Sequence, residues 1–130
     1  MANNDVDVIV VGAGSAGNVL ARRLLDAGRT VAVLEAGGPA SNPVIEHVAQ
    51  AGALWRGPED WDYVTTPQAG LDGRALHLPR GKVLGGSHAL NATIWVRGAK
   101  EDFDAWAYRG CPGWSWEEVL PVFKAIENFD

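Results

Sequence analysis

Regularly spaced glycines near the N-terminus indicate a site for a ligand that carries phosphate groups. Gly12, Gly14 and Gly17 form the pattern G-x-G-x-x-G within the segment Gly12-Ala13-Gly14-Ser15-Ala16-Gly17. In this pattern the first glycine allows a tight turn, the second lets a pyrophosphate approach the backbone, and the third lets a helix pack close to a sheet. The unpaired N–H groups at the start of that helix, with their partial positive charge, would face the phosphates.

A carboxylate stands where such a site would bind a ribose. Glu35 directly follows the apolar run Thr30–Leu34, and its oxygens would accept hydrogen bonds from ribose hydroxyl groups. The same negative charge would repel a 2′-phosphate, which disfavours an NADP-type ligand. A purely structural glycine-rich turn is the alternative, but strand, glycines, helix and acid all stand in the order that nucleotide binding requires. FAD and NAD both stay open at this point, because both carry adenosine diphosphate.

A second glycine-rich stretch, Leu78–Thr93 (LPRGKVLGGSHALNAT), also exposes bare backbone. Backbone without side chains is typical of a place where a ligand or another chain segment comes close. The alternative is an ordinary loop before a helix. The presence of the first motif favours a binding site.

The elements around the first motif are predicted to form a βαβ unit. Val6–Val11 is β-branched and almost without polar residues, as in a strand that is covered on both faces. Ser15–Ala27 has the apolar stripe of a helix, with Gly28 as its stop signal. Thr30–Leu34 is a second strand, and a crossover of this length joins parallel strands with a right-handed connection. The fold class is therefore α/β.

The rest of the chain is predicted to contain further helices and a short hairpin. Asp72-Gly73 is a hairpin turn dipeptide, and Ser115-Trp116-Glu117-Glu118 is a capping box that opens a helix. The predicted elements are a helix over 42–54, strands over 61–66 and 74–78, a helix over 89–96, a solvated helix face over 101–106 and a helix over 115–128.

The composition argues against nucleic acid and membranes as partners and suggests a cytoplasmic protein. The net charge of −5 argues against binding to nucleic acid or to anionic lipid, which both carry negative charge. The apolar runs are too short for a membrane span. The N-terminal residues include acids where a signal peptide needs a basic lead. Cys111 is the only cysteine, which fits a reducing cytoplasm, and it belongs to no metal-ligand pattern. His47 and His77 have neither an acid nor a metal-ligand pattern around them. We therefore expect a cytoplasmic protein without a metal site.

Several segments together resemble the N-terminal part of the glucose–methanol–choline (GMC) oxidoreductases, a family of FAD-dependent alcohol oxidases and dehydrogenases. The stretch at 79–98 is the most diagnostic of them. The matching segments are DVIVVGAGSAGNVLARRL near the N-terminus, VLEAGG at 33–38, WDYVTTPQ at 61–68, PRGKVLGGSHALNATIWVRG at 79–98, and EDFDAWAYRGCPGWSWEEVLPVFKAIEN at 101–128.

This resemblance implies FAD as the cofactor and assigns residues to its parts. The adenosine side is implied to lie on the first motif and the end of the second strand. The implied contacts are Gly12, Gly14, Ser15, Ala16, Gly17, Glu35 and Ala36 for the nucleotide, Arg80, Gly81, Val83, Gly85, Gly86 and Ser87 for the pyrophosphate and ribityl chain, and Asn91, Ala92, Thr93 and Ile94 near the isoalloxazine ring. Trp61 is expected to pack against the cofactor region, with a simple core role as the alternative. A loop of bare backbone suits such a flat, polar-edged ring.

The cofactor is expected to be bound non-covalently. Some members of the family attach FAD through a histidine immediately before the asparagine of this loop. Here Leu90 occupies that position, before Asn91, and His88 lies two residues earlier. His88 is more readily explained as a hydrogen-bonded loop histidine than as a cofactor attachment point.

The resemblance also implies an activity that this chain cannot perform alone. The implied reaction is oxidation of a small-molecule alcohol (a CH–OH donor) by hydride transfer to flavin N5, with reoxidation by O₂ or another acceptor. The family's catalytic histidine lies beyond the part matched here, so no catalytic residue is assigned in 1–130. GMC enzymes are several times longer, and we expect residues 1–130 to be the N-terminal portion of a Rossmann-like, glutathione-reductase-like FAD domain that a second polypeptide completes.

Two other functions remain open from the sequence. One is a non-catalytic FAD- or NAD-binding module or subunit, and the other is a lyase that uses the GMC fold. An NAD-dependent dehydrogenase domain is a further possibility, which the segment 79–98 argues against.

Overall fold

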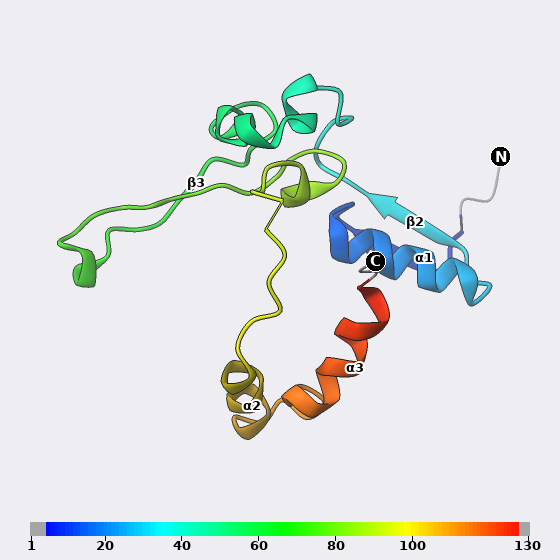
Figure 1. The fold of residues 1–130 in the computed structure, drawn as a ribbon. Helices are drawn as coiled ribbons and strands as arrows, with labels where there is room; N and C mark the ends of the chain where they lie inside the picture. Colours follow the sequence, from blue (N-terminus) through cyan, green and yellow to red (C-terminus); the bar gives the residue numbers. More distant parts are fainter. Residues whose placement is uncertain (1–4, 128–130) are drawn as a thin grey trace. The chain divides into compact units, whose positions relative to one another are not determined.

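The computed structural model describes residues 5–127, which form two compact units that divide between Thr93 and Ile94 (Figure 1). The first unit opens with strand β1 (Val8–Val11), helix α1 (Ser15–Asp26) and strand β2 (Val31–Leu34). The two strands pair in parallel, with Val8 opposite Val31 and Val11 opposite Leu34. This confirms the predicted βαβ unit and the α/β class.

Local hydrogen bonds set the ends of this unit. The N–H of Ala27 bonds to the carbonyl of Arg23, and Gly28 follows with a φ of 75°, so α1 ends where the glycine predicted it. At the start of the strands, the carboxylate of Asp7 accepts hydrogen bonds from the N–H and the hydroxyl of Thr30, at 2.8 and 3.0 Å. These contacts hold the two strands in register where they begin.

The two strands are less covered than their sequence predicts. α1 packs against both strands, and Val10 and Ala21 are buried at this contact. By contrast, Ile9 is 59% exposed and Val11 is 83% exposed. Within the described residues, the expectation of burial on both faces is therefore not met, because no second layer covers the other face.

The segment after β2 forms two 3₁₀ helices, η1 (Pro43–Glu46) and η2 (Val48–Leu54), so the single helix predicted over 42–54 was wrong. Its start was placed correctly, since the side chain of Asn42 caps the N–H of Val44 at 3.1 Å. His47 interrupts the helix, with non-helical φ and ψ values of −111° and 86°. The break fits a segment whose apolar residues pack on a core formed by Leu54, Val83 and Leu90, rather than along one helical stripe.

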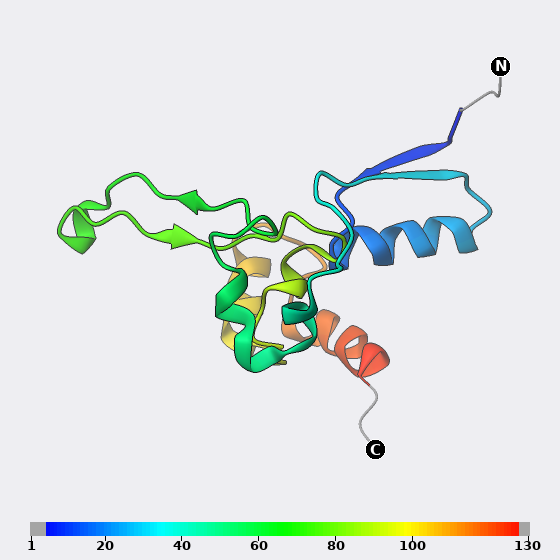
Figure 2. The ribbon, with the colours of Figure 1, turned by 90° about the horizontal axis from the view of Figure 1, so that it is seen from above.

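A narrow hairpin follows, with strands β3 (Tyr63–Val64) and β4 (His77–Leu78) in antiparallel pairing (Figure 2). Its two arms run side by side to a turn that contains the 3₁₀ helix η3 (Ala69–Leu71). Asp72 and Gly73 have φ values of 53° and 74°, as expected for a hairpin turn of this composition. The hairpin is confirmed, but its regular strands are shorter than predicted.

The second glycine-rich stretch ends in a 3₁₀ helix, η4 (Gly86–Ala89), and the helix predicted over 89–96 was wrong. The side chain of Asn91 accepts a hydrogen bond from the N–H of Thr93 at 2.7 Å, and Thr93 has a φ of 51°. An Asn side chain that bonds the backbone two residues on competes with helix formation. The chain therefore continues without regular structure to the next helix.

The second unit contains helices α2 (Lys100–Tyr108) and α3 (Trp116–Ile126). The predicted capping box is present, because the Ser115 side chain accepts from the N–H of Glu118 and the Glu118 carboxylate accepts from the N–H of Ser115. Phe103 is buried between the helices, with its ring centroid 5.2 Å from that of Trp106 and 5.7 Å from those of Trp116 and Phe123. The predicted end of the last helix at 128 lies outside the described residues.

An ion pair also fixes the ends of this unit, between the side chains of Arg97 and Glu127. None of the helices within residues 5–127 is both long and apolar enough to span a membrane.

Candidate functional site

A pocket of about 550 Å³ lies where the strands β1 and β2 end and the second glycine-rich stretch returns. Its size is within the range of small-molecule and cofactor sites. All of its lining residues belong to the first unit: Val11, Gly12, Gly14, Leu34, Glu35, Ala36, Trp61, Tyr63, Arg80, Gly81, Gly86 and Ser87. Residues far apart in the sequence therefore share one site at the carboxyl ends of parallel strands, where α/β sheets bind their ligands.

The two glycine-rich stretches contact each other through their backbones. The N–H of Gly85 donates to the carbonyl of Ala13 at 2.9 Å, and Gly14 pairs with Gly85 in a parallel bridge. A Cβ atom on Gly86 would lie 2.9 Å from the Cα atom of Gly14, and Gly86 itself has a φ of 61°. Only glycine satisfies both conditions, so the second stretch needs bare backbone in order to meet the first.

The start of α1 has the features of an anion site. A Cβ atom on Gly17 would lie 2.0 Å from the carbonyl oxygen of Gly12, which confirms the close packing that the motif predicts. Among the described residues, no side chain caps α1 at Gly14. The N–H groups of the first turn are therefore available to a phosphate, as is the partial positive charge of the 12-residue helix.

Glu35 shapes the first glycine loop as well as lining the pocket. Its carboxylate accepts hydrogen bonds from the N–H of Ala13 at 2.7 Å and from the N–H of Gly37 at 2.8 Å. The bond from Ala13, followed by that from Gly37, lowers the pKa of the Glu35 carboxyl against an opposing effect of burial. Each oxygen keeps a second lone pair, so the ribose contact of Glu35 stays a prediction.

Aromatic side chains form one wall of the pocket. The rings of Trp61 and Tyr63 stack with an interplanar angle of 6° and a centroid distance of 5.8 Å, and Nζ of Lys82 lies 4.7 Å from the Trp61 ring centroid. Trp61 was among the cofactor contacts predicted from the sequence, but Tyr63 was not. The signal was available, because residues two apart in a strand project on the same side.

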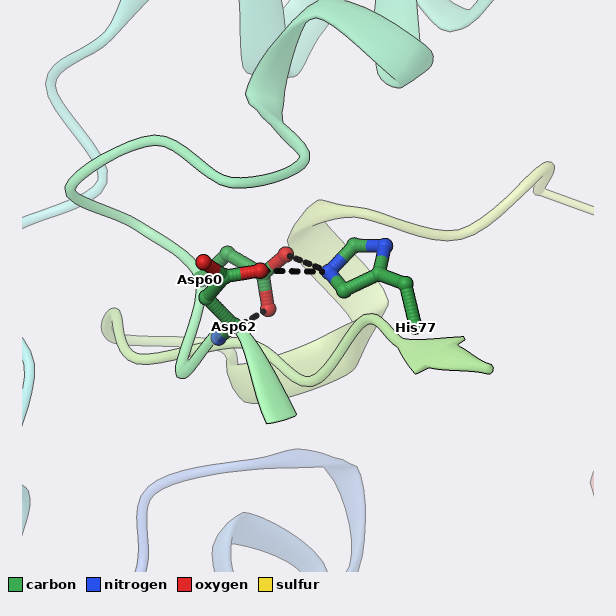
Figure 3. Close-up of side chains that lie close together, drawn as sticks. All are labelled: Asp60, Asp62 and His77. Carbon is green, nitrogen blue, oxygen red and sulfur yellow. Dashed lines mark hydrogen bonds and ion pairs between the residues drawn. The ribbon is translucent and has the colours of Figure 1, made fainter. Parts of the chain in front are cut away.

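Beside this wall, three side chains from the base of the hairpin converge (Figure 3). Nε2 of His77 lies 3.2 Å from Oδ2 of Asp60 and 3.1 Å from Oδ1 of Asp62. The expectation that no acid accompanies His77 was wrong, because hairpin pairing joins residues that are distant in the sequence. Carboxylates and imidazole are also metal ligands, and these three side chains lie close enough together to share an ion. The three backbone hydrogen bonds that Asp60 accepts already give this carboxylate a structural function, and the absence of a metal site stays a prediction.

Comparison with known proteins assigns the family. The family model described as GMC oxidoreductase matches residues 6–128. The chain belongs to the GMC oxidoreductase family.

The similar proteins include enzymes with different substrates in their names. The chain is 52% identical over 123 residues to an uncharacterized GMC-type oxidoreductase of Mycobacterium tuberculosis, an alignment that covers 94% of this chain and 23% of that protein. It is 44% identical over 129 residues to the oxygen-dependent choline dehydrogenase of Photobacterium profundum, covering 98% and 23% of the two chains. The crystal structure of pyridoxine 4-oxidase from Mesorbium loti is similar with a TM-score of 0.86 and 44% identity, covering 94% of this chain and 24% of that one.

This GMC chain thus spans about a quarter of the length of the curated relatives it matches. Its α/β structure is consistent with part of a Rossmann-like FAD domain, as the sequence predicted. The family and its structural neighbours support FAD as the cofactor. The pocket fits that cofactor, because two glycine-rich loops meet, with Gly86 packed directly on Gly14, at an uncapped helix start.

The predicted FAD contacts of this GMC chain divide into three groups. Half of them line the pocket: Gly12, Gly14, Glu35, Ala36, Trp61, Arg80, Gly81, Gly86 and Ser87. Others lie behind the lining residues. Ser15, Ala16 and Gly17 belong to α1, Gly85 pairs with Gly14, and Val83 is a core residue that is 1% exposed. The remaining residues are exposed, and their contacts with the flavin ring stay predictions: Asn91, Ala92, Thr93 and, in the second unit, Ile94.

Proposed function

We propose that this chain supplies the FAD-binding part of a GMC oxidoreductase that oxidises the CH–OH group of a small alcohol. The observation that carries the proposal is the meeting of Ala13 and Gly85 at the pocket, which joins the nucleotide motif to the family's diagnostic segment. A bound flavin supplies a two-electron acceptor for hydride. O₂ or another oxidant would accept the electrons afterwards.

The residues of this chain would bind and orient the cofactor. The N–H groups at the start of α1 and the guanidinium of Arg80 would offset the charge of the pyrophosphate. The aromatic wall of Trp61 and Tyr63 would exclude water from one side of the pocket. Glu35 would hold the first loop in its binding shape.

A non-covalent cofactor is part of this proposal. Leu90, at the position where relatives can carry the attaching histidine, is 4% exposed and packs with Leu54 and Val83. A leucine offers no nucleophile. His88 is exposed and lies on η4, two residues away from that position.

A second polypeptide that carries the rest of the GMC fold would complete the protein. The exposed apolar side chains on the βαβ unit support this part of the proposal, in particular Ile9 on β1 and Val19 on α1, which are 59% and 63% exposed. The catalytic base would come from that polypeptide. A cytoplasmic location stays a prediction from the single cysteine.

The test begins with the colour of the purified protein. A bound oxidised flavin absorbs at about 450 nm. Acid precipitation of the protein should release the flavin into the supernatant. In the complex with the second polypeptide, which would supply the catalytic base, anaerobic addition of alcohols should then bleach this band. A colourless folded protein would refute the FAD proposal, and flavin that precipitates with the polypeptide would refute non-covalent binding. A yellow protein that no alcohol bleaches would favour the non-catalytic module or the lyase.

A further inference from the structure

The carboxylate of Asp60 is a buried acceptor at the base of the hairpin. Its side chain is 0% exposed. Oδ1 accepts hydrogen bonds from the N–H groups of Asp62 and Arg80, at 3.1 and 2.9 Å, and Oδ2 accepts one from the N–H of Arg56 at 2.9 Å. A single side chain therefore joins three backbone positions that span 24 residues of sequence, from 56 to 80.

Two of these three positions have unusual backbone geometry. Arg56 and Asp62 have φ values of 62° and 49°, a region that residues with a Cβ atom rarely adopt. Such conformations persist where the surroundings impose them, and they gather at functional sites. Here the hydrogen bonds from both residues to Asp60 impose them, so the carboxylate determines how the chain turns on either side of it.

The third position, Arg80, lines the cofactor pocket. Asp60 pairs with Gly81 in an antiparallel bridge, flanked by bonds from the N–H of Trp61 to the carbonyl of Arg80 at 2.8 Å and from the N–H of Lys82 to the carbonyl of Glu59 at 2.7 Å. Trp61, Arg80 and Gly81 all line the pocket. The backbone that Asp60 holds is therefore the backbone that forms this part of the pocket wall.

His77 places an imidazole beside the buried charge. Its Nε2 atom faces the carboxylates of both Asp60 and Asp62, as Figure 3 shows, and is itself buried. Burial alone would raise the pKa of the Asp60 carboxyl, but the N–H groups of Arg56, Arg80 and Asp62, with the charge of His77, lower it to about 2. The carboxylate is thus ionised, and a charged acceptor makes the strongest of these bonds.

We propose that Asp60, paired with His77, is a positioning residue for the cofactor, which holds the Arg80–Gly81 turn in the shape that the pocket needs. The proposal rests on the proposed FAD site but goes beyond it, because neither Asp60 nor His77 lines the pocket. It assigns a function in cofactor affinity to side chains that lie behind the wall formed by Trp61, Arg80 and Gly81.

The main test compares two substitutions in the holoprotein. Asp60→Asn keeps the shape of the side chain but removes the charge and turns one acceptor into a donor. Asp104→Asn is the matched control, because the Asp104 carboxylate also accepts a backbone hydrogen bond, from Trp116 at 3.0 Å, within the second unit. The flavin is removed, and FAD is titrated back while its fluorescence quenching, its visible circular dichroism and the urea midpoint of the apoprotein are recorded.

Asp60→Asn should raise the dissociation constant for FAD about tenfold or more, because a buried charged acceptor is lost from the turn. The visible dichroism of any bound flavin should change as well. Asp104→Asn should leave both unchanged, even if its urea midpoint falls. A dissociation constant within twofold of the unmodified protein for Asp60→Asn, or an equal loss in both variants, would overturn the proposal.

A second variant decides the question if Asp60→Asn does not fold. His77→Gln replaces the imidazole with a neutral amide that has an N–H donor but cannot take up a proton. It should weaken FAD binding severalfold, and the amide of Arg80 in the apoprotein should exchange its hydrogen faster. Unchanged FAD affinity together with unchanged exchange at Arg80 in this variant would contradict the positioning function.

Discussion

The backbone N–H of Gly85 donates a 2.9 Å hydrogen bond to the carbonyl oxygen of Ala13. This bond joins the loop between β1 and α1 to a segment more than half the chain away, and both segments line the same pocket. This crossing explains the glycine at position 86, because a Cβ atom there would lie 2.9 Å from the Cα atom of Gly14 and would separate the two backbones. The cofactor site is therefore a product of two loops that depend on each other.

The first prediction concerns Gly17. Gly17→Ala should destabilise the first unit by about 3 kcal/mol or more, since its Cβ atom would overlap the carbonyl oxygen of Gly12 and only a backbone shift could relieve this. FAD binding should be lost in parallel. Urea unfolding and FAD titration measure the two effects. Gly70→Ala is the control, because nothing lies within 4 Å of its Cβ position, and it should be close to neutral.

The second prediction concerns Glu35. Glu35→Gln should cost about 1 to 2 kcal/mol, because a charged acceptor of two backbone N–H groups becomes a neutral one with a single acceptor oxygen. FAD affinity should fall with it, as measured by fluorescence titration at pH 7. Glu101→Gln, on the exposed first turn of α2, should change neither quantity. Equal affinity for FAD in Glu35→Gln and the unmodified protein would show that the loop keeps its shape without this charge.

The third prediction concerns pH. The pKa of Asp60 is lowered from 3.8 to about 2 on folding, so its ionised form stabilises the protein above pH 3.8, and this contribution disappears as the pH falls toward 2. The difference corresponds to about 2 kcal/mol. Unfolding free energies measured between pH 5 and pH 2 should therefore fall less steeply in Asp60→Asn than in the unmodified protein. Parallel curves for the two proteins would contradict this assignment.

The fourth prediction concerns the aromatic wall. Trp61→Leu should weaken FAD binding by about 1 kcal/mol, because it removes the stacking partner of Tyr63 and part of the apolar pocket wall. Trp106→Leu, in the second unit, should lower the stability of that unit without changing the affinity for FAD. Titration of the apoprotein measures both, and an equal effect of the two substitutions would argue against a pocket function for Trp61.

Local signals in the sequence were sufficient for the elements that do not depend on distant contacts. The β-branched strands, the G-x-G-x-x-G turn, the end of α1 at Gly28 and the capping box at Ser115 all follow from the residues within one turn or strand. The family and its cofactor could be predicted as well, because the diagnostic segment at 79–98 is continuous. These features are encoded over short distances.

Two predicted helices are absent from the structure, one because of a distant core contact and one because of a local side-chain hydrogen bond. The segment 42–54 is not one helix, because its apolar residues pack on Val83 and Leu90. The segment 89–96 is not helical, because the side chain of Asn91 bonds to the backbone of Thr93. In the first case a core contact, and in the second a side-chain bond, replaced the hydrogen bonds of a regular helix.

The sequence by itself determined that this chain has a βαβ unit, a nucleotide motif and the residues of a GMC oxidoreductase. Only the tertiary structure decided which of these residues share a pocket, that Tyr63 joins them, and that His77 lies against the buried carboxylate of Asp60 next to that pocket. The physical reason is that strand pairing and backbone crossings join positions 12–14 with 85–86 and 60–62 with 77–81. A one-dimensional pattern contains the residue types for these contacts but not their distances.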